Sequence, residues 1–302
     1  MTTRQRRTLL ALALTVVPVA AAACGGSPQA VDGGGDTVTQ ATTQATTPAT
    51  GSAAITVGPP PTTTPPPEGV TDPPDWLGSR VLPTDANGVV PPQTTPPELV
   101  DRRFATEDTI PSPGPSFVST IKPLDGEPLE RSTWSAACPV GVDELRYVTV
   151  SFWGFDDRPH TGELIVRADV ADDVAGVFRQ LFDERFPIEQ MRIITEADLE
   201  SEPTGDGNNS GSFVCRPVTG GTSYSEHAYG LAVDINPFQN PYVKGDRVLP
   251  ELATAYTDRA RVRPGMIGPD SAPTRAFAAM GWSWGGNWDT LKDYQHFSLN
   301  DR

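Results

Sequence analysis

The sequence predicts an α+β domain over residues 132–302, with a small antiparallel sheet and flanking helices. Two segments, 146–153 and 162–167, alternate apolar and polar residues and are rich in β-branched and aromatic side chains, which is typical of strands. A third segment, 169–186, repeats apolar residues at helical spacing. Strand and helix segments follow one another without a regular β-α-β repeat, which favours α+β over a parallel α/β fold.

Taken in chain order, the first predicted strand is followed by a turn-rich loop over 154–161 and then by the second strand. The helix over 169–186 has one apolar face, made of Val170, Val174, Val177, Phe178, Leu181 and Phe182. Pro187 ends this helix, and 188–195 predicts a further strand. A short helix is expected over 273–280, with Ser271 as its cap and Gly281 at its end.

Residues 1–24 have the pattern of an export signal. Basic residues near the start precede an uncharged, apolar run over 8–23, which is short for a bilayer span and contains Pro18. The run ends in three alanines followed by Cys24 and two glycines, which resembles a bacterial lipobox, although Ala21 stands where Leu is usual. We therefore expect a lipoprotein signal peptide with a lipid on Cys24. The alternative is an ordinary Ala-x-Ala cleavage site with an incidental cysteine.

Two further segments precede the α+β domain. Residues 25–74 consist mainly of Thr, Pro, Gly, Ala and Gln, and lack the apolar surface needed to offset the entropy of ordering, so they predict a disordered, extended tether. Residues 75–131 contain apolar anchors such as Trp76, Leu99 and Phe104 but keep many prolines. We interpret this segment as an irregular arm that packs on the domain, the alternative being more linker.

Composition excludes several classes of protein. The net charge of −15 argues against non-specific nucleic-acid binding and against attachment to anionic lipids by charge alone. With three cysteines and three histidines, a cysteine-rich zinc scaffold is excluded. If Cys24 is acylated, Cys138 and Cys215 remain as an even pair, and in an exported protein a disulfide is expected. The alternative is a cysteine nucleophile with a histidine partner.

The strongest chemical signal is a set of possible metal ligands. His227 and Asp234 are seven residues apart, with small residues at 230 and 232, and His296 lies near the C-terminal end with Asp293 three residues before it. An odd separation would point two side chains on one strand to opposite faces, so His227 is expected in a turn and Asp234 on the strand. Two imidazoles, one carboxylate and an open fourth position are typical of a catalytic zinc site.

The pattern Ser-x-His-x-x-Gly-x-Ala-x-Asp at 225–234, followed by Trp-Gly-Gly-x-Trp and Asp-x-x-His-Phe at 284–297, resembles the D-Ala-D-Ala carboxypeptidase and dipeptidase metallopeptidases, and is close to phage L-alanyl-D-glutamate endolysins. This resemblance implies a fold of the hedgehog/D-Ala-D-Ala-peptidase type and one Zn²⁺ per chain, held by His227, Asp234 and His296. It implies that Asp293 is the catalytic base, that Ser225 lies near the substrate and that Arg216 stabilises the polarised carbonyl. Arg216 departs from the family's pattern, because a cysteine precedes it.

The resulting expectation is a zinc metallopeptidase that cleaves peptidoglycan stem peptides, as a D-alanyl-D-alanine carboxypeptidase or, alternatively, as an L-Ala-D-Glu endopeptidase. The rival reading is a zinc-containing, non-catalytic cell-wall-binding module on the same fold. We expect a monomer held on the outer face of the cell membrane by its lipid anchor alone, with no nucleic-acid partner. His160 is interpreted as a loop residue or a satisfied polar residue, the alternative being a role in substrate binding. Trp282, Trp284 and Trp288 are interpreted as packing residues, the alternative being that any of them borders the substrate cleft.

Overall fold

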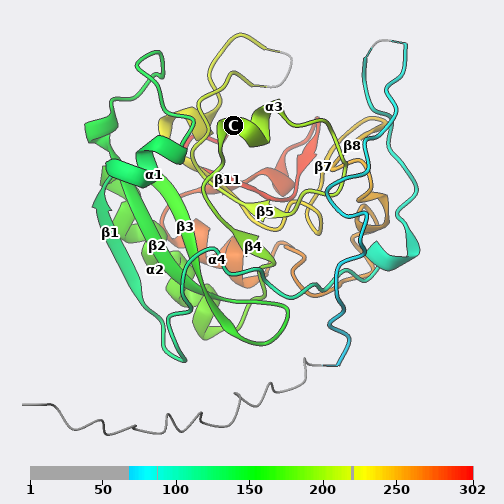
Figure 1. Ribbon diagram of the computed structural model, residues 1–302, viewed down its shortest axis with the longest axis horizontal. Coiled ribbons are helices and arrows are strands. Elements are labelled where there is room, and N and C mark those ends of the chain that lie inside the picture. The colour runs from blue at the N-terminus through cyan, green and yellow to red at the C-terminus, as the bar shows by residue number, and fades with distance from the viewer. Residues whose placement is uncertain (1–67, 87, 219–220, 302) are drawn as a thin grey trace, which may run out of the picture. The chain divides into compact units, whose positions relative to one another are not determined.

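The two alternating segments pair as the longest antiparallel hairpin of the structure, β2 (Leu145–Trp153) with β3 (Pro159–Arg167). The second strand begins at Pro159, earlier than expected, because His160 and Thr161 pair with Phe152 and Ser151. A further strand, β1 (Ser119–Pro123), pairs with β2, so the sheet has the order β1-β2-β3 (Figure 1).

The computed structural model describes residues 68–86, 88–218 and 221–301. The predicted signal peptide with Cys24, and nearly all of the predicted tether, lie outside these described residues. The α-helices are α1 (Gly126–Arg131), α2 (Ala171–Asp183), α3 (Glu196–Glu200) and α4 (Ala272–Ala279). The remaining strands are β4 (Gln190–Met191), β5 (Asn209–Ser210), β6 (Ala232–Asp234), β7 (Tyr242–Lys244), β8 (Arg247–Leu249), β9 (Ser283–Trp284), β10 (Lys292–Asp293) and β11 (His296–Ser298).

Helix α2 lies against β2 and buries its apolar face there (Figure 1). Phe178 and Leu181 belong to the main core together with residues of β2, β6 and α4. The helix is shorter than the predicted 169–186, since residues 168–170 form a 3-10 turn and Arg185 takes a left-handed φ of 54° that an α-helix cannot continue through.

Three small sheets make up the rest of the described β structure. Strands β6, β11 and β9 form one antiparallel sheet, β10, β7 and β8 form a second, and β4 pairs in parallel with β5. The predicted strand over 188–195 is reduced to the two residues of β4. Helix α4 agrees with the prediction, but the Ser271 hydroxyl bonds to Gly268 and does not cap the helix. Helices mixed with small antiparallel sheets agree with the predicted α+β class.

The predicted arm, 75–131, is irregular only in part. Residues 119–131 form β1 and α1, which corrects the expectation of an irregular segment throughout. The strand Ser-Thr-Ile-Lys-Pro lacks an apolar alternation because it lies at the edge of its sheet, where a proline and a lysine are tolerated. Across the pair, the hydroxyls of Thr120 and Thr149 are hydrogen-bonded at 2.7 Å.

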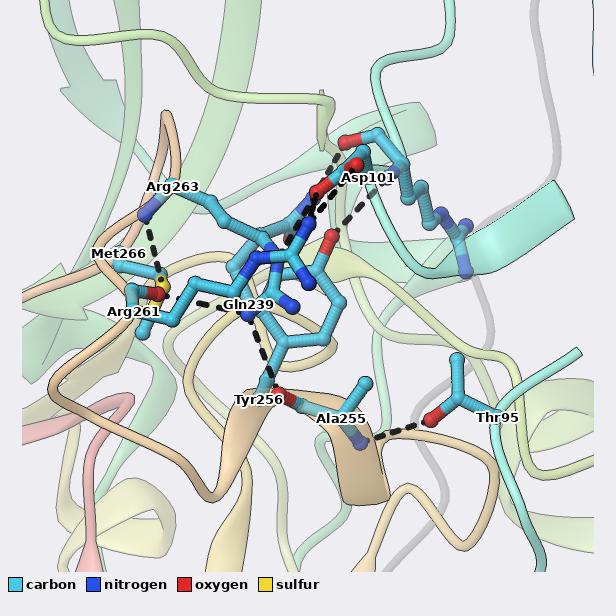
Figure 2. A network of polar contacts seen from close by, with 9 residues as sticks. Thr95, Asp101, Gln239, Ala255, Tyr256, Arg261, Arg263 and Met266 are labelled. Atoms are coloured by element: carbon cyan, nitrogen blue, oxygen red, sulfur yellow. Dashed lines mark hydrogen bonds and ion pairs between the residues drawn. The ribbon is translucent and has the colours of Figure 1, made fainter. Parts of the chain in front are cut away.

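Apolar side chains of the arm are buried in a second core. Leu82, Val90, Leu99 and Phe104 of the arm share this core with residues that follow β6 in the sequence, namely Phe238, Leu252, Ala253, Tyr256 and Met266. Polar contacts join the same two segments: Figure 2 shows Asp101 facing Arg261 and Arg263, and the Thr95 hydroxyl bonded to the backbone of Ala255. The arm thus supplies one side of this second core.

A buried ion pair also anchors the arm. The guanidinium of Arg102 binds both carboxylate oxygens of Glu189 at 2.5 and 2.8 Å and is stacked over the rings of Phe104 and Phe238. Arg102 is 3 % exposed, so its charge depends on Glu189 and on the carbonyl of Asp206 for compensation.

Cys138 and Cys215 form a disulfide, as the sequence predicted, which leaves neither sulfur as a free thiol nucleophile. The bond closes a separation of 77 residues and ties the segment after α1 to the segment that leads into residues 225–234. Thr133 reinforces the link, because its hydroxyl accepts the backbone N–H of Cys215. Within the described ranges, no helix combines the length and apolar character that crossing a membrane requires.

Candidate metal centre

His227 lies in a one-turn 3-10 helix, Glu226–Tyr229, directly before β6. Ser225 caps this turn by accepting the backbone N–H of His227, and Gly230 ends it in a left-handed conformation with φ of 68°. A Cβ at Gly230 would come within 2.6 Å of the backbone nitrogen of Arg167, so the turn needs glycine to pack against β3. His227 is therefore off the strand, as the odd separation from Asp234 requires.

Asp234 and His296 are brought together by strand pairing. Asp234 ends β6, His296 begins β11, and the two residues are directly opposite each other in the antiparallel register. Opposed residues of an antiparallel pair point to the same face of the sheet, which explains how two residues 62 positions apart share one site.

The three side chains converge at hydrogen-bond distance. The Nε2 of His227 lies 3.2 Å from Oδ2 of Asp234, and the Nδ1 of His296 lies 3.0 Å from Oδ1 of Asp234. One ligand atom from each residue falls within 4.8 Å of the others. Zinc bonds of about 2.0–2.2 Å at tetrahedral angles separate ligand atoms by roughly 3.3–3.6 Å, so small shifts would fit the set to zinc.

The protonation pattern of His227 also fits a metal ligand. Its Nδ1 is hydrogen-bonded to the backbone carbonyl of Ser212, which must accept, so Nδ1 carries the proton. Nε2 is then the ring nitrogen that faces Asp234, and it is the atom available to bind a metal ion. A ligating histidine fixed through its other ring nitrogen is usual in zinc sites.

Charge in the cluster favours a cation. Burial alone would raise the pKa of Asp234, but the charges and hydrogen bonds of His227 and His296 outweigh burial and hold that pKa well below its ordinary value. The carboxylate is therefore ionised and faces two nitrogen donors. The donor set His, Asp, His is one that zinc prefers.

Asp293 lies on β10, three residues before His296, and is held close by the glycine-rich turn Gly285–Asn287. A Cβ at Gly285 would come within 2.7 Å of the Asp293 carbonyl oxygen and 3.0 Å of its Cβ, so only glycine allows this approach. The Oδ1 atom of Asp293 is buried and has no hydrogen-bond partner among the described residues. An ionisable oxygen of this kind is available to exchange a proton with a ligand.

Burial, followed by the nearby charge of Asp234, raises the pKa of Asp293 to about 6. The two imidazoles and a hydrogen bond from Gln295 oppose this rise. A carboxyl with a pKa near neutrality suits a group that takes up and gives back a proton.

The other two residues expected at the site are placed differently. Ser225 is the cap described above. Arg216 is half-buried, and its guanidinium donates to the carbonyl of Pro217, while its own carbonyl accepts the N–H of Ser225. Arg216 is thus next to the segment that carries His227, but none of the described hydrogen bonds or ion pairs joins its guanidinium to the three ligand residues.

Trp288 borders the metal centre, whereas Trp282 and Trp284 belong to the main core. The indole of Trp288 lies 5.4 Å from the ring of His296 and donates to Asp301 at 2.7 Å. Its ring is therefore fixed beside a candidate ligand, which agrees with the alternative that the sequence left open for these tryptophans. Glu226, next to His227, is buried and accepts a hydrogen bond from Asn300 at 2.8 Å.

His160 does not belong to this centre. It lies on β3 instead of in a loop, is 3 % exposed, and bonds Asp108 at 2.8 Å and Asp156 at 3.0 Å through its two ring nitrogens. Asp108 lies in the arm and Asp156 in the loop after β2, so His160 joins these two segments. Its polar groups are satisfied, in line with the structural reading of this residue.

Sequence reasoning missed two residues that adjoin Asp293. Gln295 hydrogen-bonds its side chain, and Tyr242 of β7 is directly opposite Asp293 in the antiparallel pair β10–β7. The charge of Asp293, added to burial, raises the pKa of Tyr242. Gln295 could have been noted as the residue between Asp293 and His296, but no sequence pattern links Tyr242 to Asp293.

Comparison with known proteins bears on the same segment. No curated protein and no solved structure matches the chain. Residues 219–299 match the family described as D-alanyl-D-alanine carboxypeptidase, and this range contains His227, Asp234, Asp293 and His296. The segment that builds the candidate metal centre is therefore similar to the D-alanyl-D-alanine carboxypeptidase family of peptidases.

Proposed function

We propose that this protein is a zinc-dependent peptidase that cleaves peptidoglycan stem peptides as a D-alanyl-D-alanine carboxypeptidase. The observation that carries the proposal is the convergence of His227, Asp234 and His296 with a buried, unpartnered oxygen of Asp293 close by. The family match over 219–299 supports the same reading.

Each residue has a role in this proposal. His227, Asp234 and His296 would hold the zinc ion, which when bound polarises a carbonyl and lowers the pKa of water. Asp293 accepts a proton from the attacking water and returns it to the leaving amine. Trp288 limits the space beside His296 and helps to exclude bulk water there. Arg216 would assist at the carbonyl only if its side chain leaves the Pro217 carbonyl when substrate binds.

The buried oxygen of Asp293 argues against a purely binding module. Burying a carboxylate oxygen without a hydrogen-bond partner costs free energy. A protein that only binds zinc has no use for such an oxygen. A peptidase does gain, because its base must stay free to exchange protons.

Turnover of purified muropeptides tests the proposal. Incubation with pentapeptide muropeptides ending in D-Ala-D-Ala should release one alanine, detected by mass spectrometry. A chelator should abolish the release and added zinc should restore it, while His296→Ala should be inactive under all conditions. Cleavage between L-Ala and D-Glu would identify the endopeptidase instead. Zinc and muropeptide binding without any product would identify the binding module.

We further propose that the protein is exported and attached through a lipid on Cys24 to the outer face of the cell membrane. The sequence of residues 1–24 and the tether composition of 25–74 support this location, where the peptidoglycan substrate is found. Detergent partitioning tests it: the native protein should enter the detergent phase and Cys24→Ala should not. Retention of Cys24→Ala in the membrane would contradict lipidation at this residue.

A further inference from the structure

A cavity of about 360 Å³ adjoins the candidate metal centre. Its walls come from α3 and the loop that follows, from residues 249–251, which begin at the last residue of β8, and from Pro237 and Gln295. Gln295 directly precedes the candidate ligand His296, which places their Cα atoms about 3.8 Å apart. Its side chain also hydrogen-bonds Asp293. The cavity and the metal centre therefore share a wall.

The lining of the cavity is acidic. It contains Asp198, Glu202 and Glu251, and no Lys, Arg or His is among the lining residues. Asp198 is already compensated, since it receives two hydrogen bonds of 2.7 Å from Arg192. The described ion pairs include neither Glu202 nor Glu251. Two of the three carboxylates thus have charge that no described cation neutralises by contact.

Of Glu202 and Glu251, Glu251 gives the stronger indication of a ligand, because it is buried. It is only 9 % exposed, and its carboxylate is hydrogen-bonded to its own backbone N–H, with no other hydrogen bond or ion pair to it among the described contacts. Burial raises the pKa of Glu251, and the more distant charge of Arg247 opposes the rise only in part. A buried carboxylate without a cation costs free energy, and a cationic ligand group would remove that cost.

The arm holds this cavity in shape. The backbone N–H of Leu82 donates to the carbonyl of Pro203, and the N–H of Gln93 donates to the carbonyl of Glu251. A third bond runs from the N–H of Gly78 to the carboxylate of Asp206. Both walls that carry the uncompensated carboxylates are therefore fixed from outside by residues 78–93.

We propose that this cavity binds the side-chain ammonium group of a diamino acid in the substrate peptide, with Glu251 as its main partner and Glu202 at the entrance. The inference rests on the proposed function, because a stem peptide supplies a diamino acid just before its terminal D-alanine pair. A substrate bound with its scissile carbonyl at the metal centre would extend across Gln295 into the cavity. Glu251 is thus a specificity-determining residue for the substrate.

A pair of substrates that differ in one charge tests the proposal. The peptide L-Ala-D-Glu-L-Lys-D-Ala-D-Ala is compared with the same peptide acetylated on the lysine Nε, which removes the charge and keeps the chain. We expect kcat/KM to be roughly tenfold or more higher for the free amine. Glu251→Gln should remove this preference, so that kcat/KM for the free amine falls to that of the acetylated peptide. Glu200→Gln, an exposed residue on α3 outside the cavity lining, is the matched control and should behave as wild type.

The outcomes separate this inference from the proposed function. If the wild type cleaves both peptides equally well, the cavity does not bind the ammonium group, although the proposed peptidase activity is supported. If it cleaves neither, the proposed function is wrong, and calorimetric binding of both peptides to the zinc-loaded protein decides about the cavity. A preference for the free amine that Glu251→Gln removes supports the inference, and equal or undetectable binding of both peptides overturns it. Should Glu251→Gln fail to fold, the acetylation comparison on the wild type decides alone.

Discussion

Among its single residues, the candidate metal centre combines side chains that are held in place by hydrogen bonds with a carboxylate oxygen that has no hydrogen-bond partner among the described residues. His227, Asp234 and His296 are constrained by hydrogen bonds that orient their donor atoms, whereas Asp293 Oδ1 is buried and unpartnered. A ligand gains from fixed geometry, and a base gains from an oxygen that remains free. Within this small region of the fold, metal binding and proton transfer are thus assigned to different residues.

This division predicts the behaviour of Asp293→Asn. The amide keeps the size of the side chain but cannot take up a proton, so hydrolysis should fall about 10²–10⁴-fold. Zinc content should stay at one per chain, because Asp293 is not one of the three converging residues. Metal analysis and steady-state kinetics on the same preparation measure both effects. Loss of zinc would make Asp293 a ligand, and unchanged hydrolysis would assign the proton transfer to another group such as Glu226.

A second residue-scale prediction concerns His160 and pH. Burial alone would lower the pKa of His160, but hydrogen bonds to Asp156 and Asp108 outweigh burial and raise the pKa above its ordinary value. A raised pKa in the folded state means that the charged imidazole stabilises the fold fully below about pH 6.5. This stabilisation is then lost as the pH rises through the folded-state pKa.

Urea unfolding from pH 5.5 to 9 measures this effect. The difference in unfolding free energy between wild type and His160→Gln should be largest near the acidic end and should shrink as pH rises above about 6.5. The control is Asp108→Asn, which removes one of the two carboxylates and should reduce the pH dependence without abolishing it. A difference that does not vary with pH would show that folding does not raise the pKa of His160.

Among the helices and strands, the sequence predicted those in which the spacing of apolar residues continues over many consecutive positions. The apolar face of α2 and the alternation of β2 and β3 can be recognised in the sequence. The three candidate metal ligands can be recognised too, because each of them lies in a short motif with several characteristic residues. Strands of two or three residues, such as β4, β9 and β10, carry too little pattern to be recognised. β1 was missed because it forms by pairing with β2, whose paired residues lie 23 to 31 positions away in the sequence, and its own residues show no alternation.

The disulfide between Cys138 and Cys215 gives a prediction at this scale. It closes a loop of 77 residues, and its removal should lower the free energy of unfolding by about 2–5 kcal/mol. The double variant Cys138→Ser/Cys215→Ser should show this loss in urea unfolding and should still bind zinc, since the ligands are held by β6, β11 and the turn before β6. Wild type under strong reducing conditions provides the control and should show the same loss. Equal stability of the oxidised and reduced proteins would contradict a structural role for the bond.

At the scale of the whole molecule, two of the three hydrophobic clusters of the described chain, the main core and the second core, meet in the segment after β6. Asp234 ends β6 in the main core, and Phe238, four residues later, is fully buried in the second core with the arm. The cavity proposed to read the substrate is bordered by this second core, since Leu252 directly follows Glu251. The parts of this site are α3 and the loop after it, the end of β8 and the residue before β11, with the arm fixing the walls from outside. Such a site could not be predicted from the sequence, because its parts are adjacent only after folding.

The last prediction follows from this arrangement: the arm unfolds together with the rest of the described chain and not before it. Leu99 is fully buried in the second core, so Leu99→Ala should lower the free energy of unfolding by about 2–5 kcal/mol. Val81 lies in the same arm but is 59 % exposed, so Val81→Ala should change stability by no more than about 0.5 kcal/mol. Fluorescence and circular dichroism during urea unfolding should give one coincident transition for both variants, shifted only for Leu99→Ala. If Leu99→Ala leaves the midpoint unchanged, or if an early transition separates from the main one, the arm is a peripheral segment and cannot hold the cavity walls at Pro203 and Glu251 in place.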